Sequence, residues 1–578
     1  MSHREQTKHR LLSVIIIGFF VVISSCTRVP APKQVADVIY SGGDIITIND
    51  SQPTVEALAI KDGKIIAVGA KVDALKHKGP ATKMVDLRGK TLLPGFIDAH
   101  GHVFNAGLQA LAANLLAKPD GNVNGIVALQ QTLSNWVEKY PERLASTGWV
   151  IGFGYDDSQL EEQRHPTRDD LDVVSNTVPV LVIHQSGHLA AINSKGLEVA
   201  GITAVTKDPA GGVIRRREGG LEPDGVLEEM AFFELVFKVL GTLGTDDNKA
   251  LLKAGLDLYA RYGFTTAQEG RATPEAIATE ATVAREGGLK MDVVAYADIQ
   301  GAADTIKPPL HAKTYTQHFR IGGAKLSLDG SPQGKTAWLT EPYHVPPEGQ
   351  SADYLGYPAV PDNEAIALVD KAFSNGWQIL AHCNGDAAAD QFIMAIRLAI
   401  EKHGKADRRP VMIHAQTVRE DQLDDMKELG IIPSFFGMHT YYWGDWHRDS
   451  VLGPERGARI SPAASVLARG MVYTQHHDSP VALPNSIMIL ASQVNRTTRS
   501  GQVLGPGQRV DAMDALKSIT INAAYQYFEE KTKGSLESGK FADFVILDKN
   551  PLKVESMAIK DIKVVETIKE GKSIYMAP

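Results

Sequence analysis

The chain has 578 residues, several times the usual length of one domain, so it can bury a large core and hold more than one domain. Its composition is that of an ordinary globular protein, with 43% apolar and 22% charged residues. The formal net charge of -8 indicates no excess of basic residues that could bind phosphates, which argues against a nucleic-acid partner.

Residues 1–26 have the anatomy of a secretory signal peptide. A basic start, MSHREQTKHR, precedes the uncharged run LLSVIIIGFFVVI, which is shorter than the roughly 20 residues that a membrane-spanning helix needs. ISSC then resembles a bacterial lipobox, in which Cys26 is lipidated after cleavage. We therefore expect a lipoprotein of the cell envelope on the periplasmic side, and Thr27 favours the outer membrane. An uncleaved N-terminal anchor is the alternative.

Both ends of the chain have the pattern of short antiparallel strands. Apolar runs alternate with Gly and Asp turns in VADVIYSGGDIITI, EALAIKDGKIIAVG, FADFVILDKN and IKVVETIKEGKSIY. We expect residues 35–90 and 533–578 to pair into one small β-sandwich domain.

Residues 91–532 alternate short β-rich runs with helical stretches. The eight runs are LLPGFIDAH, GFTTAQEG, KMDVVAYAD, FRIGGAKLSLDG, WQILAHCNGD, PVMIHAQ, GIIPSFF and MVYTQHHDSPV. This rhythm predicts an α/β fold, a (β/α)8 barrel of the TIM type. The gap at residues 103–261 is longer than one helix needs, which predicts a large insertion over the barrel mouth after the first strand.

Four histidines, a lysine and an aspartate lie in or at the ends of these runs. Alternate residues of a strand point to the same side, so His100 and His102 would project together. Taken singly, His414 could be a core histidine, Lys325 an ion-paired lysine and Asp478 a helix cap. Catalytic residues of such barrels lie at the carboxyl ends of the strands, so the shared position predicts one site. Its members are His100, His102, Lys325, His382, His414 and Asp478.

The sequence resembles the amidohydrolase superfamily, and within it the N-substituted formamide deformylase-like (YtcJ-like) branch. Seven motifs in family order carry the resemblance: PGFIDAHGHV, QSGHLAAINSKGL, AKLSLDGSPQGKTAW, AHCNGDAAAD, VMIHAQ, HHDSPV and GSLESGKFADFVILD. SGH stands where many relatives have Asp-Gly-His, and CNGDAAA and HHDSPV replace commoner forms. The ligand-type residues are kept, so these departures concern the choice of substrate.

The resemblance implies two divalent metal ions. His100, His102 and Asp478 would hold one ion, and His382 and His414 would hold the other. Histidine and carboxylate ligands suit Zn²⁺, with manganese, iron or nickel as alternatives.

The resemblance also implies that Lys325, carboxylated on its amine, bridges the two ions. An ammonium would repel both cations, whereas a carbamate offers two anionic oxygens. Two such ions can hold a bridging hydroxide and polarise a substrate carbonyl. Asp478 is the expected catalytic residue, taking the proton of the attacking water and returning it to the leaving amine. Cys383 is a rival nucleophile, although strand alternation turns it away from the side that His382 faces.

Substrate contacts are expected from His188 in the insertion and from His439 and Trp443 in the aromatic run HTYYWGDWH. Such a loop suits an apolar or aromatic substrate, but the same residues could simply pack the loop onto the barrel.

The sequence thus predicts a lipid-anchored, metal-dependent hydrolase of carbon–nitrogen bonds in non-peptide or cyclic amides. A lactonase or esterase on the same site is the first alternative, because the same hydroxide can expel oxygen. A deaminase is disfavoured by HCNGDAA, where a glutamate is usual, and a non-catalytic binding lipoprotein would be expected to lose ligands. The expected partners are a small-molecule substrate and a membrane, and a homodimer is left open.

Overall fold

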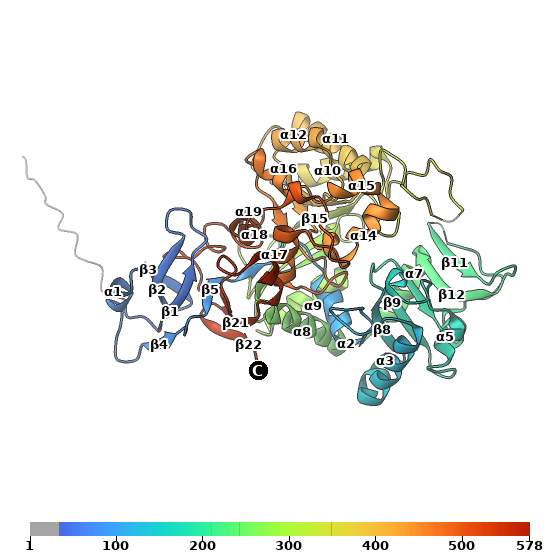
Figure 1. The fold of residues 1–578 in the computed structure, drawn as a ribbon, viewed down its shortest axis with the longest axis horizontal. Helices are drawn as coiled ribbons and strands as arrows, with labels where there is room; N and C mark the ends of the chain where they lie inside the picture. Colours follow the sequence, from blue (N-terminus) through green and yellow to red (C-terminus); the bar gives the residue numbers. More distant parts are fainter. Residues whose placement is uncertain (1–33, 210, 242, 348) are drawn as a thin grey trace, which may run out of the picture.

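The computed structural model describes residues 34–578 except residues 210, 242 and 348. The predicted signal peptide and Cys26 lie outside this part of the chain. Three sheets organise the molecule: one from the chain ends at the left of Figure 1, one in the insertion at the lower right, and the barrel sheet between them. In the described residues, the helices are too short or too polar to cross a membrane.

The central sheet contains eight parallel strands, as the sequence predicts. They are, in spatial order, β6 (Phe96–Ile97), β13 (Phe264–Ala272), β14 (Asp292–Asp298), β15 (Phe319–Ser327), β16 (Gln378–Cys383), β17 (Val411–His414), β18 (Ile432–Phe435) and β19 (Thr474–Gln475). Just beyond the two edge strands, the backbone N–H of Asp478 donates to the carbonyl of His100 at 3.3 Å. The curled sheet and its helices form a TIM-like α/β fold.

The helices between and after these strands begin and end at recognisable signals. Thr273 caps α9, where its side chain accepts a hydrogen bond from Ala276 N, and Gly430 ends α12 with a φ of 69°. The helices are α9 (Pro274–Arg285), α10 (Asp362–Ser374), α11 (Asp386–His403), α12 (Glu420–Leu429), α13 (His439–Tyr442), α14 (Gly444–Trp446), α15 (Gly453–Ala458), α16 (Ala463–Ala468), α17 (Ser486–Asn495), α18 (Ala512–Ser518) and α19 (Ile521–Gln526). Helical turns of other types are η2 (Ala303–Thr305), η3 (His447–Val451) and η4 (Pro506–Gln508).

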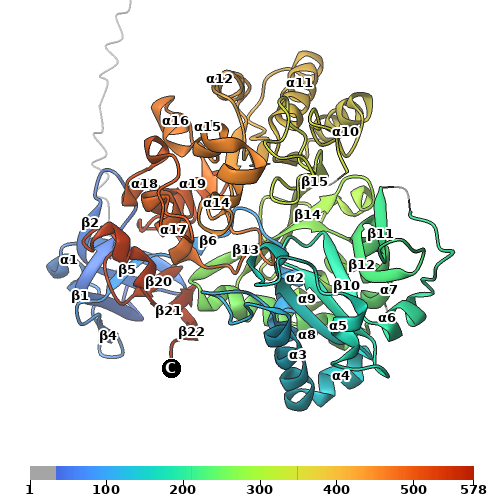
Figure 2. The same ribbon diagram turned by 45° about the vertical axis from the view of Figure 1, so that its right-hand side comes forward.

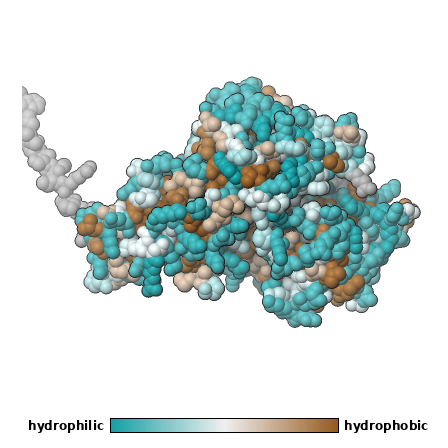
Figure 3. Space-filling model, in the orientation of Figure 1, coloured by the Kyte–Doolittle hydropathy of each residue, from teal (hydrophilic) through white to brown (hydrophobic). Residues whose placement is uncertain are grey.

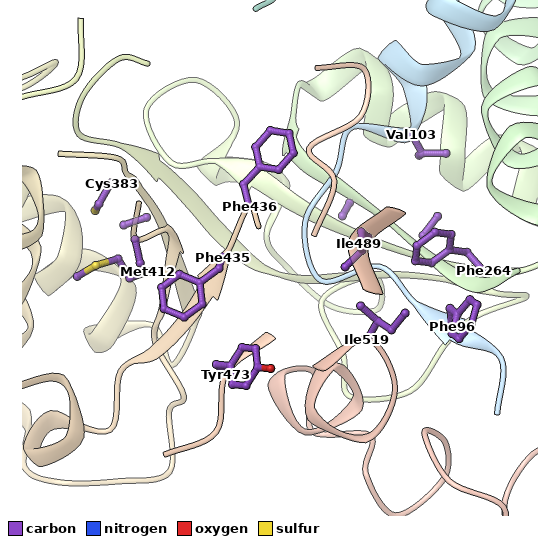
Figure 4. Close-up of a cluster of buried hydrophobic side chains, with 14 of the residues drawn as sticks. Phe96, Val103, Phe264, Cys383, Met412, Phe435, Phe436, Tyr473, Ile489 and Ile519 are labelled. Carbon is purple, nitrogen blue, oxygen red and sulfur yellow. The ribbon is translucent and has the colours of Figure 1, made fainter. Parts of the chain in front are cut away.

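The core of the barrel is a cluster of buried aromatic and aliphatic side chains. Figure 4 shows Phe96 and Phe264 near one edge of the sheet and Met412 and Phe435 farther along it. Cys383 is part of this cluster and is fully buried. Burial raises the pKa of its thiol well above the usual value, so the nucleophilic thiolate is disfavoured. By contrast, the face in Figure 3 is largely hydrophilic with scattered apolar residues.

The insertion after β6 has its own six-stranded sheet, visible at the right of Figure 2. Its strands, in spatial order, are β11 (Gly212–Arg216), β12 (Pro223–Glu229), β10 (Leu189–Ile192), β9 (Val180–His184), β8 (Val150–Tyr155) and β7 (Ala113–Asn114). Its helices are α2 (Val103–Leu111), α3 (Ile126–Lys139), α4 (Pro141–Thr147), η1 (Asp157–Gln159), α5 (Arg168–Asp172), α6 (Ser194–Ala200), α7 (Met230–Leu240) and α8 (Thr245–Arg261).

Two glycines let α2 and α8 approach closely. A Cβ at Gly107 would lie 1.9 Å from Leu251 O, and one at Gly255 would lie 2.1 Å from Val103 O. This contact fixes the start of α2, which His102 directly precedes. Helix α8 also contacts β13 and α9, so the end of the predicted insertion serves as a barrel helix, a role that chain length alone does not reveal.

The insertion is hydrogen-bonded to loops at the carboxyl ends of the barrel strands. The Gln109 side-chain amide donates to Pro480 O at 3.0 Å, and that of Gln185 donates to Val481 O at 3.1 Å. Both acceptors lie in the loop after β19. The insertion is therefore held against the side of the barrel where the predicted ligands lie.

Strands from both chain ends share one hydrogen-bonded sheet. Its order is β22 (Lys572–Met576), β21 (Val564–Lys569), β20 (Phe544–Leu547), β5 (Thr91–Pro94), β1 (Val38–Ile46), β2 (Thr54–Lys61) and β3 (Lys64–Gly69), with β4 (Lys83–Asp86) paired to β1. Helices α1 (Lys71–Leu75) and η5 (Ser556–Asp561) complete this part of the chain. The sandwich layering of this unit stays a prediction.

The run predicted as the first barrel strand divides at Gly95. Residues 91–94 pair with β20 and β1 in the terminal sheet, and only Phe96–Ile97 join the barrel. The backbone N–H of Gly95 donates to Asp543 O, and a Cβ here would lie 2.3 Å from the Thr265 side chain. The continuous apolar pattern hides this change of sheet.

Candidate metal centre

Asp478 lies beside both histidines of the first motif. Its Oδ1 is 3.3 Å from His100 Nε2 and 3.4 Å from His102 Nε2. His100 follows β6 and is buried. His102 directly precedes α2, and 21% of its side-chain surface is exposed to solvent. The first predicted group of ligands is therefore together in space.

The other three predicted ligands join the same cluster. Lys325 Nζ lies 3.1 Å from His100 Nε2, and the rings of His382 and His414 are 4.4 Å apart between centroids. The His414 ring is also 5.8 Å from that of His100. The structure thus brings all six predicted ligand residues to one place at the carboxyl ends of β15, β16, β17 and their neighbours.

The orientation of His100 is set by Gln268 in the middle of β13. His100 Nδ1 lies 2.7 Å from Gln268 Oε1, while the amide nitrogen of Gln268 donates to Ala99 O and to the Tyr527 hydroxyl. Because Gln268 offers its oxygen to the ring, His100 carries its proton on Nδ1. The lone pair of Nε2 then faces Lys325 and Asp478, as a metal ligand requires.

Asp329 orients His382 in a similar way. Its Oδ1 lies 3.1 Å from His382 Nδ1 and also accepts the backbone N–H of Asn384 at 2.9 Å, while Oδ2 accepts that of Gly385 at 2.7 Å. The carboxylate is a pure acceptor, so His382 donates from Nδ1 and keeps a lone pair on Nε2.

Glu269 approaches His102 from the neighbouring strand. Glu269 Oε1 lies 3.8 Å from His102 Nδ1, and its Oε2 accepts the backbone N–H of Phe104 at 2.8 Å. Burial raises the pKa of the Glu269 carboxyl to about 7. The three partners Gln268, Glu269 and Asp329 were not among the predicted site residues, although each lies at the carboxyl end of a predicted strand.

Two buried atoms of this cluster have no hydrogen-bond partner among the described residues: His414 Nε2 and Asp478 Oδ1. With His100 these residues offer ligand atoms that all lie within 4.8 Å of one another. Leaving buried polar atoms unpaired is costly, and a cation would satisfy both. Imidazole nitrogens and a carboxylate are the donors that zinc and similar divalent ions take. The residues therefore fit a metal cofactor.

Lys325 is fully enclosed, with 2% of its surface exposed. Burial lowers the pKa of its ammonium to about 7, against the opposing effect of the nearby Asp478 carboxylate. Part of the Lys325 population is therefore a neutral amine at neutral pH, the form that can react as a nucleophile.

His188, a predicted substrate contact, lies in the insertion directly before β10. Its Nδ1 is 2.9 Å from Glu229 Oε2, and 26% of its side-chain surface is exposed to solvent. Burial alone would lower the pKa of His188, but the carboxylates of Glu229 and Asp478 outweigh it and raise that pKa. The contacts of the His188 ring are with Glu229 and Phe233 of the insertion, so its role in binding substrate stays a prediction.

His439 and Trp443 are buried instead of lining an open surface, with 2% and 3% exposure. His439 Nδ1 lies 2.9 Å from His447 Nε2, and the Trp443 indole donates to Asp156 Oδ2 at 3.1 Å. Asp156 belongs to the insertion, so Trp443 packs a barrel loop onto it. These contacts favour the packing interpretation of the aromatic run.

A parallel α/β barrel with histidines, a lysine and an aspartate at the carboxyl ends of its strands is the arrangement of a metal-dependent hydrolase. The chain belongs to the amidohydrolase family, whose model matches residues 83–575. It is therefore an enzyme of the class that hydrolyses carbon–nitrogen bonds.

Relatives of known name match nearly the whole chain. YtcJ of Bacillus subtilis (strain 168), named as an amidohydrolase, is 25% identical over 93% of this chain and 99% of its own. The N-substituted formamide deformylase of Arthrobacter pascens is 24% identical over 94% of this chain and 99% of its own. The crystal structure of an uncharacterized metal-dependent hydrolase from Pyrococcus horikoshii OT3 has a TM-score of 0.71 and 26% identity, covering 90% of this chain and 99% of that one.

Proposed function

We propose that this enzyme hydrolyses small non-peptide amides, including cyclic amides, with two divalent metal ions, for which Zn²⁺ is the best match. The observation that carries the proposal is the position of Asp478, whose unpartnered Oδ1 lies within 3.4 Å of both His100 and His102. The similarity to an N-substituted formamide deformylase supports an amide whose nitrogen bears a substituent.

Two groups of side chains would hold the ions, bridged by a carboxylated Lys325. The first group is His100, His102 and Asp478, and the second is His382 and His414. When bound, the metal ions supply Lewis acidity, which polarises the amide carbonyl and lowers the pKa of water toward neutrality. The lone pairs of His100 and His382 already face the cluster because Gln268 and Asp329 accept the protons on the opposite ring nitrogens.

Asp478 has the properties of the proton carrier in this reaction. Burial alone would raise the pKa of its carboxyl, but His414 and the other imidazoles outweigh it and hold that pKa well below the usual value. Asp478 is therefore ionised at neutral pH and has an acceptor oxygen for the proton of an attacking water, whose own pKa the metal ions would lower. As the carbon–oxygen bond forms and the carbon–nitrogen bond breaks, Asp478 returns this proton to the leaving nitrogen, so that water is added across the bond.

His188 is proposed to bind the substrate from the insertion. Its pKa is raised by Glu229, so the imidazolium form is favoured relative to a free histidine. A protonated ring can donate a hydrogen bond to a polar group of the amide. His439 and Trp443 would shape the site from behind, through their contacts with His447 and Asp156.

We also propose that the enzyme is anchored to the cell envelope by lipid on Cys26, with residues 27–34 as a tether. The support is the sequence KHRLLSVIIIGFFVVISSC, in which a basic start, a short apolar run and small residues precede the cysteine. A substrate that reaches the periplasm would be accessible to the site in this arrangement.

The test is a panel of N-formyl and N-acyl amines, cyclic amides and lactones, with release of amine or acid as the readout. Amine release that stops after chelation and returns with Zn²⁺ is the expected result. Hydrolysis restricted to lactones and esters would contradict the proposed bond type, and amine release that survives complete removal of metal would contradict the mechanism.

A further inference from the structure

Lys335 is a buried lysine whose ammonium faces no carboxylate in the described residues. It lies in the loop between β15 and α10 and is 9% exposed. Its Nζ donates to Ser450 Oγ at 2.8 Å and lies 4.8 Å from the ring centroid of Trp446. An ammonium has three donors, so two remain unused by these contacts.

The other buried lysines each have a partner that Lys335 lacks. Among the described residues the buried lysines are Lys325, Lys335, Lys533, Lys540 and Lys569. Lys533 and Lys569 lie 2.5 Å and 2.6 Å from Asp292 Oδ2, and Lys540 lies 2.9 Å from Glu537 Oε1. Lys325 belongs to the metal centre. Of these five described lysines, Lys335 is therefore the one whose charge neither a carboxylate nor the metal chemistry explains, and a buried charge is costly without a partner.

The loop that carries Lys335 is tied directly to the metal centre. It begins at Asp329, which accepts from His382, and it is closed by a hydrogen bond from Thr336 N to Ser331 O at 3.0 Å. Tyr354 holds the backbone at Lys335, because its hydroxyl donates to Lys335 O at 3.0 Å. Lys335 itself has a φ of 56°, a left-handed conformation that is unfavourable for a residue with a side chain.

The remaining contacts come from the segment after β18. The Trp446 indole donates to Gln333 O at 3.1 Å, and Ser450 lies in the adjoining turn η3. The loops that follow β15 and β18 thus meet at Lys335, on the side of the barrel where the ligands lie. Trp446 is 37% exposed, so the aromatic face beside the ammonium is open to solvent on part of its surface.

We propose that Lys335, Ser450 and Trp446 form a subsite for a carboxylate, so that the preferred substrate is an amide that also carries an acidic group. The inference rests on the proposed amide hydrolysis and adds the class of substrate. The Ser450 oxygen accepts from Lys335, which leaves its own proton to donate to the anion. One ammonium and one hydroxyl suit a monoanion better than a phosphate dianion.

Another cation near the site is less suited to this role. Arg271, at the end of β13, already lies 3.7 Å from the Asp298 carboxylate, and its side chain is 49% exposed. Its charge is partly neutralised and well solvated, so an ion pair with a substrate carboxylate would contribute less binding energy there. Burial also lowers the pKa of Lys335 below its ordinary value, which a bound anion would reverse.

The test compares acid and carboxamide forms of the same compounds, such as N-formylphenylalanine and N-formylphenylalaninamide, by calorimetric binding and by turnover. The variants are Lys335→Met, Lys335→Arg and the control Lys64→Met. Lys64 is the control for loss of a lysine beside an aromatic ring, because its Nζ lies 5.5 Å from the Phe541 ring and it is exposed in the terminal sheet. Circular dichroism establishes that each variant is folded.

We expect the wild type and Lys64→Met to bind the acids at least about tenfold more tightly than the amides, Lys335→Met to lose this preference, and Lys335→Arg to keep part of it. A preference that survives Lys335→Met, or equal binding of acids and amides by the wild type, would overturn the subsite. Acid binding that depends on Lys335 without any amide hydrolysis would overturn the proposed reaction and leave the subsite standing.

Discussion

His476 Nε2 lies 3.2 Å from His414 Nδ1, and His476 Nδ1 lies 2.9 Å from Ser434 Oγ. Both contacts are buried, so the two rings and the hydroxyl form a fixed chain behind the ligand cluster. If His414 donates from Nδ1 to His476, then His476 donates from Nδ1 to Ser434. In that arrangement the unpartnered Nε2 of His414 carries the lone pair that a metal needs.

Removing the hydrogen bond between His476 and His414 should weaken metal binding without removing a ligand. We expect His476→Phe to lower the affinity for metal by about tenfold to a hundredfold, as other losses of a ligand's hydrogen-bond partner do. Competition with a chelator measures the change. His403→Phe is the control, because His403 contacts Asp370 on the outer helices. Equal metal affinity in His476→Phe and the wild type would show that this ring does not position His414.

The sequence predicts the barrel well because most of its strands are apolar runs bounded by turn residues. It also predicts the six ligand-type residues, since these stand where such runs end. Their hydrogen-bond partners are harder to predict: Gln268 meets His100 across 168 positions of the chain, and nothing local marks it as different from other strand residues. The split at Gly95 is hidden for a similar reason, because a buried strand has the same pattern in either sheet.

The bridging role of Lys325 predicts a change in metal stoichiometry. Wild-type enzyme should contain close to two divalent ions per chain, and Lys325→Ala should lose much of this metal, because the carbamate that would link the two ion sites is gone. Short carboxylic acids should restore part of the activity by replacing the carbamate oxygens. Elemental analysis and turnover measure the two effects. A Lys325→Ala enzyme with both ions and normal turnover would rule out the bridge.

A buried charge network joins the barrel to the C-terminal segment. Asp292, at the start of β14, accepts from Lys533 at 2.5 Å and Lys569 at 2.6 Å. Burial alone would raise the pKa of Asp292, but these two ammonium groups outweigh it and lower that pKa well below the usual value. We expect Asp292→Asn to reduce the free energy of unfolding by about 3–5 kcal/mol at pH 7, because it leaves two buried cations short of a partner.

The loss of unfolding free energy in Asp292→Asn should depend on pH in one direction only. A carboxyl group with a depressed pKa in the folded state stabilises the protein fully above its unfolded pKa of about 3.9, and the contribution is lost as pH falls through the folded pKa. The difference in unfolding free energy between wild type and Asp292→Asn should therefore be constant from pH 7 to about pH 5 and shrink below about pH 4. A difference that grows toward acid pH would contradict the assignment.

The proposed lipid anchor predicts that Cys26→Ala blocks lipidation and leaves unprocessed precursor. Labelling of cells with a radioactive fatty acid measures this directly. Cys383→Ala is the control, since this thiol is buried in the barrel core and should not affect labelling. Label on the Cys26→Ala protein would show that ISSC is not the lipidation site.

Asp478 combines two roles that one substitution can separate. Asparagine keeps the size of the side chain and one oxygen that can face a metal, but it cannot accept the proton of water at neutral pH. We expect Asp478→Asn to retain most of its metal while kcat falls by about a hundredfold to ten-thousandfold, the usual range for general acid–base catalysis. The pH profile should also lose the limb that reports a carboxylate. A metal-loaded Asp478→Asn enzyme with near wild-type kcat would move the proton transfer to another group, and His188, the predicted substrate contact on the insertion, would be the first residue to replace.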